Sequence, residues 1–134
     1  MTTARVQKVR QILEDGQPGF AEVVLEVATA GSTAEVYTMF EDLRFTADGK
    51  IVTFMAYGGT HLHLKLDLVR EVELIHKMND RGLPSYQVCF LDQDRLPMLR
   101  VYLRKSDKAE TNPPRHDLFM RLLEKYGQRV ALDS

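Results

Sequence analysis

Two histidines, His61 and His63, are the residues whose type and spacing best suit chemistry in this sequence. They alternate with Leu62 and Leu64 in a polar–apolar run that continues to Leu68. Because side chains two apart on a strand share one face, at roughly 6.5–7 Å along the backbone, the two imidazoles are predicted to lie side by side. The pair could hold a transition metal, or one ring could bind a haem iron. The alternative is two half-exposed polar residues on the outer face of a strand.

A second candidate group is Arg100, Tyr102 and Arg104, which alternate with apolar residues near the end of the sequence. On a strand, the two guanidinium groups and the phenol would share one face. The planar fork of arginine matches a carboxylate, so this face suits an anionic ligand such as the propionates of haem. The alternative is that the arginines pair with acidic side chains of a neighbouring strand.

Other chemistry finds little support in the sequence. His76, His116 and Cys89 could add ligands to a metal site, but none stands at a spacing typical of structural zinc. Cys89 lies in an apolar run, which predicts a buried and inert thiol. The sequence contains no nucleophile elbow and no phosphate-binding glycine loop. No catalytic residue is therefore predicted.

Hydrophobic periodicity predicts an α+β fold in which an antiparallel sheet of about seven strands is flanked by an N-terminal and a C-terminal helix. The first helix follows Thr3 and is expected to stop at Gly16, while the last begins at Asn112 and the two prolines after it. The predicted strands cover residues 22–27, 35–40, 51–57, 61–68, 71–78, 86–91 and 98–103.

The composition indicates one domain, residues 1–134, with 44% hydrophobic residues to build a core. A net charge of −1 argues against nucleic acid or an anionic membrane as a partner. The sequence has no apolar stretch long enough for a signal peptide or a membrane span, which predicts a cytoplasmic protein.

The order of these segments resembles the haem-utilisation proteins of the HemS/ChuX/HutX type over roughly residues 6–127. In that family an aromatic-hydrophobic segment, a turn and a strand with a basic residue form the closing hairpin, and here the basic residue is Arg100. The turn at 92–96 lacks the usual glycine of the family, and the chain is slightly shorter than typical single-repeat members. The segments that carry the resemblance are 61–64, 72–75, 85–92, 97–103 and the final helix with Leu118, Phe119 and Leu122.

This resemblance implies haem as the ligand and a homodimer as the assembly. The two histidines cannot both be axial ligands of one haem, because such ligands approach the iron from opposite sides, and the sequence leaves the choice between them open. The residues implied for the haem site are His61 or His63 for the iron, Arg100 or Arg104 for a propionate, and Phe54 and Met55 for the ring.

The expected function is that of an intracellular, non-enzymatic haem-binding or haem-carrier protein. Members of the family carry haem or degrade it, so a haem-degrading enzyme is one alternative, although no recognisable redox or nucleotide motif supports it. The other alternative is a fold relative without haem that serves as a small-molecule or protein-interaction module.

Overall fold

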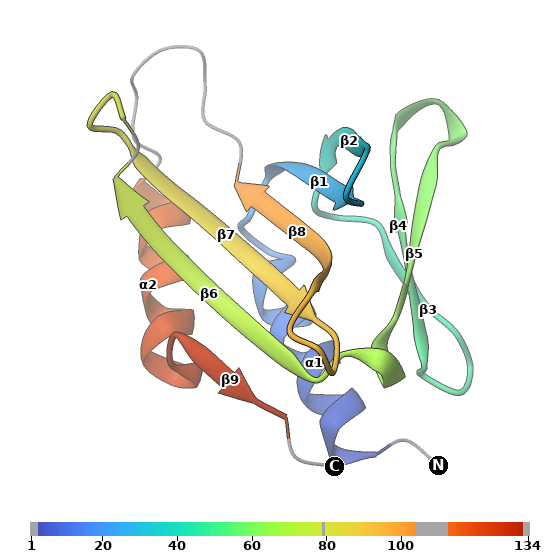
Figure 1. Ribbon diagram of the computed structural model, residues 1–134. Helices are drawn as coiled ribbons and strands as arrows, with labels where there is room; N and C mark the ends of the chain where they lie inside the picture. Colours follow the sequence, from blue (N-terminus) through green and yellow to red (C-terminus); the bar gives the residue numbers. More distant parts are fainter. Residues whose placement is uncertain (1–2, 79, 104–112, 133–134) are drawn as a thin grey trace.

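The computed structural model describes residues 3–78, 80–103 and 113–132. Their strands form a six-stranded sheet, in the order β2-β1-β8-β7-β6-β9, and a three-stranded sheet, β3-β4-β5. Both α-helices lie behind the larger sheet, and the smaller sheet stands beside it (Figure 1). The elements are α1 (Ala4–Gly16), β1 (Glu22–Ala28), β2 (Thr33–Met39), β3 (Leu43–Phe45), β4 (Ile51–Met55), η1 (Tyr57–Gly59), β5 (His61–Lys65), η2 (Leu66–Leu68), β6 (Glu71–Met78), β7 (Pro84–Leu91), β8 (Pro97–Leu103), α2 (Pro113–Tyr126) and β9 (Arg129–Ala131).

The predicted α+β class, with antiparallel strands and a helix near each end, is confirmed. The structure divides the strands between two sheets and adds β3 and β9 to those expected from the sequence. Each of these two strands has only three residues, too short for a two-residue alternation to stand out. The smaller sheet shares no strand with the larger one, so the side chains on its outer face form a separate surface.

The first helix begins at the predicted cap. The Thr3 hydroxyl accepts a hydrogen bond from the Val6 amide at 3.2 Å, which satisfies one of the free N–H groups of the first turn. Gly16 is the last helical residue and not a stop with positive φ. A Cβ at Gly16 would collide with the Phe20 ring, so close packing explains this glycine.

The run of alternating residues around the histidines is shorter as a strand than predicted. β5 ends at Lys65, and Leu66 to Leu68 turn into a short 3₁₀ helix. Leu64 and Leu66 are buried, whereas Leu68 is 49% exposed. The 3₁₀ turn breaks the two-residue period, so the alternation in sequence beyond Lys65 no longer corresponds to two faces of a strand.

One cluster of buried side chains connects both sheets and both helices. Phe54 of β4 packs against Phe40 at 5.9 Å between ring centroids, Phe40 against Phe20 at 5.2 Å, and Phe20 against Phe119 of α2 at 6.4 Å. Such tilted aromatic pairs add to the energy of burial itself. This row of rings anchors the inner face of the smaller sheet. Among the described residues, no helix is long and apolar enough to cross a membrane.

Candidate functional site

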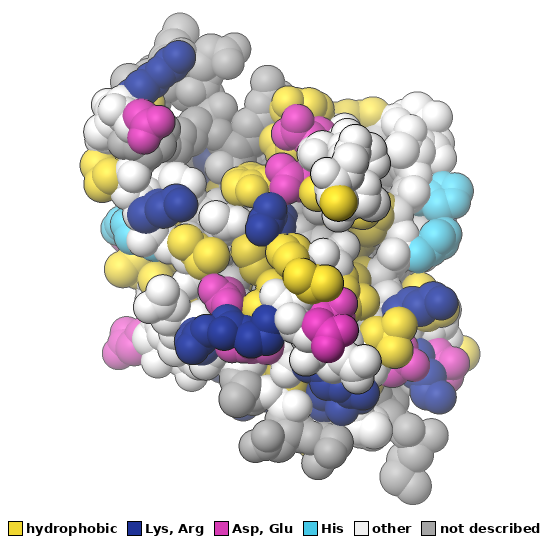
Figure 2. Space-filling view, viewed as in Figure 1, with side chains coloured by type: hydrophobic (Ala, Val, Ile, Leu, Met, Phe, Trp, Pro, Cys, Tyr) yellow, Lys and Arg dark blue, Asp and Glu magenta, His cyan; other side chains and the backbone are white. Residues whose placement is uncertain are grey.

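The predicted histidine pair lies on the outer face of β5, which is an edge strand of the smaller sheet. The positive φ angles of Gly58 and Gly59 in the preceding turn bring the chain back antiparallel to β4. His61 and His63 are both exposed, and their ring centroids are 5.0 Å apart in an edge-to-face arrangement. Figure 2 shows two neighbouring histidine side chains at the right edge of the view, over this strand. The prediction that the two rings lie side by side agrees with this geometry.

Each ring is held through its Nδ1 atom. His61 Nδ1 lies 3.1 Å from the carbonyl oxygen of Gly59. Because a carbonyl only accepts hydrogen bonds, Nδ1 of His61 must carry the proton, and Nε2 is left with the lone pair that binds metals. His63 Nδ1 lies 2.7 Å from the hydroxyl of Thr53, which can donate or accept, so this contact does not determine the tautomer of His63. The hydrogen bond of His61 therefore leaves Nε2 as its ligand atom, whereas that of His63 leaves the ligand atom undetermined.

Met55 and Phe54, which were both expected to contact the haem ring, lie on opposite faces of β4. Met55 is the cross-strand partner of His61, so its side chain flanks that ring on the outer face. Phe54 points to the other face, is 2% exposed and belongs to the core. In this conformation the Phe54 ring supports the sheet from beneath and offers no surface to a ligand, because core contacts occupy it.

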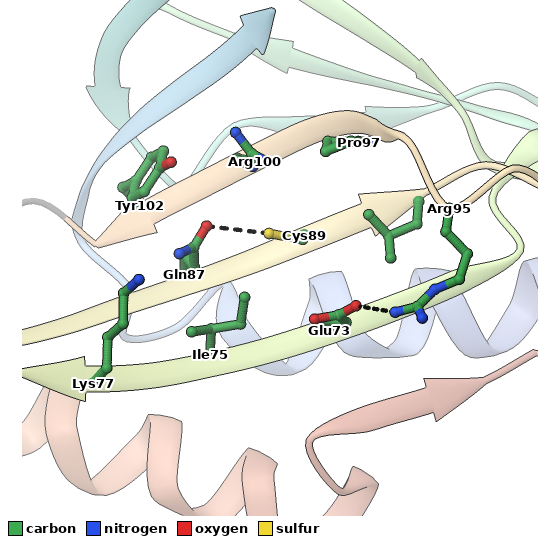
Figure 3. A pocket seen from close by; sticks show the side chains of 10 residues that line it. Glu73, Ile75, Lys77, Gln87, Cys89, Arg95, Pro97, Arg100 and Tyr102 are labelled. Atoms are coloured by element: carbon green, nitrogen blue, oxygen red, sulfur yellow. Dashed lines mark hydrogen bonds and ion pairs between the residues drawn. The ribbon is translucent and has the colours of Figure 1, made fainter.

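Arg100 belongs to a different surface, a pocket of about 490 Å³ on the open face of the six-stranded sheet. Figure 3 shows Arg100 and Tyr102 projecting from β8, Gln87 and Cys89 from β7, and Lys77 from β6. The described lining residues do not include His61 or His63. Arg104 lies outside the described residues. The lining consists of Glu73, Ile75, Lys77, Gln87, Cys89, Leu91, Arg95, Pro97, Arg100 and Tyr102.

Charged side chains in this pocket are already partly paired. Arg100 donates to Glu26 of β1 at 3.2 Å, as expected for an arginine beside an acidic neighbouring strand. Arg95 bridges Glu71 at 2.9 Å and Glu73 at 2.6 Å. Arg100 also interacts with the side chains of Cys89 and Tyr102. A guanidinium has five N–H groups in its fork, so these partners leave Arg100 able to bind a further carboxylate.

The pocket floor also contains groups that stay uncharged at neutral pH. Cys89 is buried, as predicted, but on the pocket side of the sheet, where its thiol donates to the Gln87 side chain at 3.2 Å. Burial raises the pKa of Cys89. Burial, followed by the nearby Glu26 carboxylate, raises the pKa of Tyr102. Neither group is therefore activated as an anion, which agrees with the prediction of an inert thiol.

A second histidine cluster, at the ends of β6 and β7 beside α2, joins residues far apart in the sequence. The His76 ring stacks on Tyr86 at 4.6 Å, and the Tyr86 hydroxyl lies 2.6 Å from His116 Nδ1. These side chains line a mostly apolar cavity of about 330 Å³. Sequence reasoning considered His76 and His116 singly as spare zinc ligands and missed the cluster, because no local pattern links a strand residue with one on a distant helix.

Among the described residues, no group of three or more histidine, cysteine or acidic side chains could hold a metal ion. Structural zinc sites take a tetrahedral set of four protein ligands. The histidine pair can supply at most two nitrogen ligands. Any metal bound there needs further ligands from elsewhere.

Comparisons with known proteins agree on one fold. A protein-family model matches residues 11–129. A solved structure described as the heme-binding protein ChuX superposes with a TM-score of 0.72 at 16% identity, covering 91% of this chain and 74% of ChuX. No curated protein sequence matches this chain significantly.

Longer proteins show the same fold over part of their length. ChuS, described as an E. coli heme oxygenase, gives a TM-score of 0.71 at 15% identity, covering 88% of this chain and 35% of ChuS. PhuS with bound ligand, described as a heme-binding protein from Pseudomonas aeruginosa, gives 0.66 at 15% identity, covering 85% of this chain and 32% of PhuS. At these identities the likeness concerns the fold.

Proposed function

Since this chain belongs to the haem-utilisation family of the HemS/ChuX/HutX type, we propose that it binds haem and acts as an intracellular haem carrier. The observation that carries the proposal is the bond between His61 Nδ1 and the Gly59 carbonyl, because it leaves Nε2 as the ligand nitrogen on an exposed ring. Ligand histidines are commonly oriented by such a bond to a carbonyl.

The donor set fits haem better than a bare structural ion. If haem binds, His61 would supply a protein ligand to its iron through Nε2, and one such ligand from the protein is enough to hold a haem iron. His63, whose ring edge lies against His61, and Met55 on the neighbouring strand would contact the macrocycle. When bound, haem supplies the iron that the protein transports.

The propionates of haem require cations, and the proposal assigns them to the pocket on the larger sheet. Arg100 lines that pocket together with Lys77. His61 and this pocket belong to different sheets, and the lining of the pocket includes neither His61 nor His63. We therefore propose that a homodimer completes the site, with His61 of one copy placed near the basic pocket of the other.

Titration of the purified protein with hemin tests this function. The wild type should give a Soret band shifted from that of free hemin, and His61→Ala should weaken binding by about tenfold or more, which is ~1.4 kcal/mol. His76→Ala is the matched control, since His76 Nδ1 also lies near a carbonyl, that of Ser85 at 3.2 Å, but faces the other cavity. His63→Ala should retain most of the Soret shift.

Each other outcome has a definite meaning. A flat wild-type titration would sink the proposal and favour a fold relative without haem. Loss of the Soret band on adding a reductant and oxygen would identify haem degradation in place of carriage. Light scattering with and without hemin tests the dimer, and a monomer that binds hemin at full affinity would contradict the shared site.

A further inference from the structure

The histidine pair has the geometry of a bidentate ligand as well as that of a single axial one. Nδ1 of His61 donates a hydrogen bond to the Gly59 carbonyl, and Nδ1 of His63 contacts the Thr53 hydroxyl, which can accept a hydrogen bond from the ring. When Thr53 accepts, the Nε2 atoms of both rings have lone pairs. Two neutral imidazoles on one exposed strand face are then ready to bind the same ion.

The separation of the rings fits a shared metal. A metal–nitrogen bond to an imidazole is about 2.0–2.1 Å long, and the centre of the ring lies about 1.2 Å beyond the nitrogen. When the nitrogen–metal–nitrogen angle is about 90–110°, the centroids of two imidazoles on one metal are therefore roughly 4.5–5.4 Å apart. The centroids of His61 and His63 are 5.0 Å apart. The rings of His76 and His116 are 5.6 Å apart, and His76 is also stacked on Tyr86. The centroid separation of the pair on β5 falls within this range, and that of His76 and His116 lies just outside it.

The neighbouring donor points to the kind of ion. Met55 is the cross-strand partner of His61, so its side chain leaves the sheet on the same face as the two imidazoles. Nitrogen and sulfur donors favour late transition metals over Mg²⁺ and Ca²⁺, and Cu²⁺ binds most strongly among the divalent first-row ions. In blue-copper sites a methionine sulfur is a weak ligand beside two histidines and a cysteine, so a methionine can serve as a weak additional donor to copper.

We propose that His61 and His63 chelate a Cu²⁺ ion, with the Met55 thioether as a weak third donor and water completing the coordination. This site does not depend on haem binding, but it shares the Nε2 atom of His61 with the proposed haem ligand. Copper and haem should therefore compete, and each should weaken the apparent binding of the other by an amount set by its own concentration relative to its dissociation constant.

The test is a titration of the full chain, free of haem, with copper(II) chloride, followed by electron paramagnetic resonance and equilibrium dialysis. The wild type should bind one copper with the hyperfine pattern of two nitrogens. His61→Ala and His63→Ala should each weaken binding by about tenfold or more and reduce the pattern to one nitrogen. Met55→Leu, which preserves side-chain volume, should keep both nitrogens and alter only the affinity.

His76→Ala serves as the control and should bind copper like the wild type. Unchanged copper binding by His63→Ala, or a loss caused by His76→Ala, would overturn the inference. The three histidine variants should have wild-type circular dichroism, since His61 and His63 are exposed and His76 is only half-buried.

Haem and copper binding can fail separately. His63→Ala should weaken copper binding by about tenfold or more but lower hemin affinity by a smaller factor, whereas His61→Ala should weaken both. A wild type that binds hemin but no copper refutes this inference alone, and one that binds copper but no hemin refutes only the proposed function.

Discussion

The four histidines of the chain form two pairs that are held in opposite ways. His61 and His63 are neighbours on one strand, exposed to solvent, and anchored only through Nδ1. His76 and His116 come from β6 and α2, are half-buried, and surround the Tyr86 ring. The first pair keeps ring atoms available for a ligand. The second pair uses its ring surfaces for packing and the Nδ1 atoms of both rings for hydrogen bonds within the fold.

The residue type alone therefore does not identify which histidines of this chain could bind a ligand. His61 and His76 both have Nδ1 near a backbone carbonyl, so both have a defined tautomer. What separates them is their surroundings, because stacking on Tyr86 holds the His76 ring against the core. Substitutions around His76 and His116 should therefore affect folding stability, and substitutions of His61 and His63 should affect ligand binding.

The largest expected difference is in folding stability. Tyr86 is 7% exposed and packs against both His76 and Phe119, so Tyr86→Ala should lower the free energy of unfolding by about 3–5 kcal/mol. The His61→Ala, His63→Ala double variant should change it by less than about 0.5 kcal/mol, because both side chains are exposed. Urea denaturation followed by circular dichroism measures both. An equal loss in the two variants would remove the distinction between the pairs.

A smaller effect should isolate the phenol–imidazole hydrogen bond. Tyr86→Phe and His116→Ala should each cost about 1 kcal/mol, since each removes one partner of the 2.6 Å contact. The variant with both changes should cost less than their sum, with a coupling of ~1 kcal/mol in a double-mutant cycle. Strictly additive losses would show that the bond contributes nothing in solution. Hemin binding should be unaffected in all three variants.

The smallest effect is a pH dependence that belongs to the second cluster. Burial raises the pKa of Tyr86 in the folded protein, whereas tyrosine in the unfolded chain ionises at about pH 10. The unfolded state therefore releases the phenol proton first, so this contribution to stability is complete below about pH 10 and is lost as the pH rises through the folded pKa.

Unfolding measured between about pH 9 and pH 11 should accordingly show a smaller fall in stability for Tyr86→Phe than for the wild type. Burial also raises the pKa of Tyr102 and Tyr126, so part of the fall will remain in that variant. His63→Ala should follow the wild-type curve. A slope in Tyr86→Phe as steep as that of the wild type would mean that Tyr86 ionises normally in the folded protein.

Local patterns predicted most of the secondary structure. Period and caps located α1, the β1–β2 hairpin and the start of α2 at the prolines, because each depends on side chains close in sequence. The division into two sheets was not predictable from these patterns. Alternation shows that a segment has two faces, but not which other strand will pair with it.

The candidate site divides in the same way. The sequence by itself determined that His61 and His63 share a face, since a two-residue period in a strand admits no other arrangement. The tertiary structure decided that Met55 joins them, that Phe54 turns into the core, and that Arg100 belongs to a separate pocket. Strand pairing and burial set those positions, and both depend on contacts between segments far apart in the chain. The same holds for the contact of Tyr86 with His116, which no spacing along the sequence encodes.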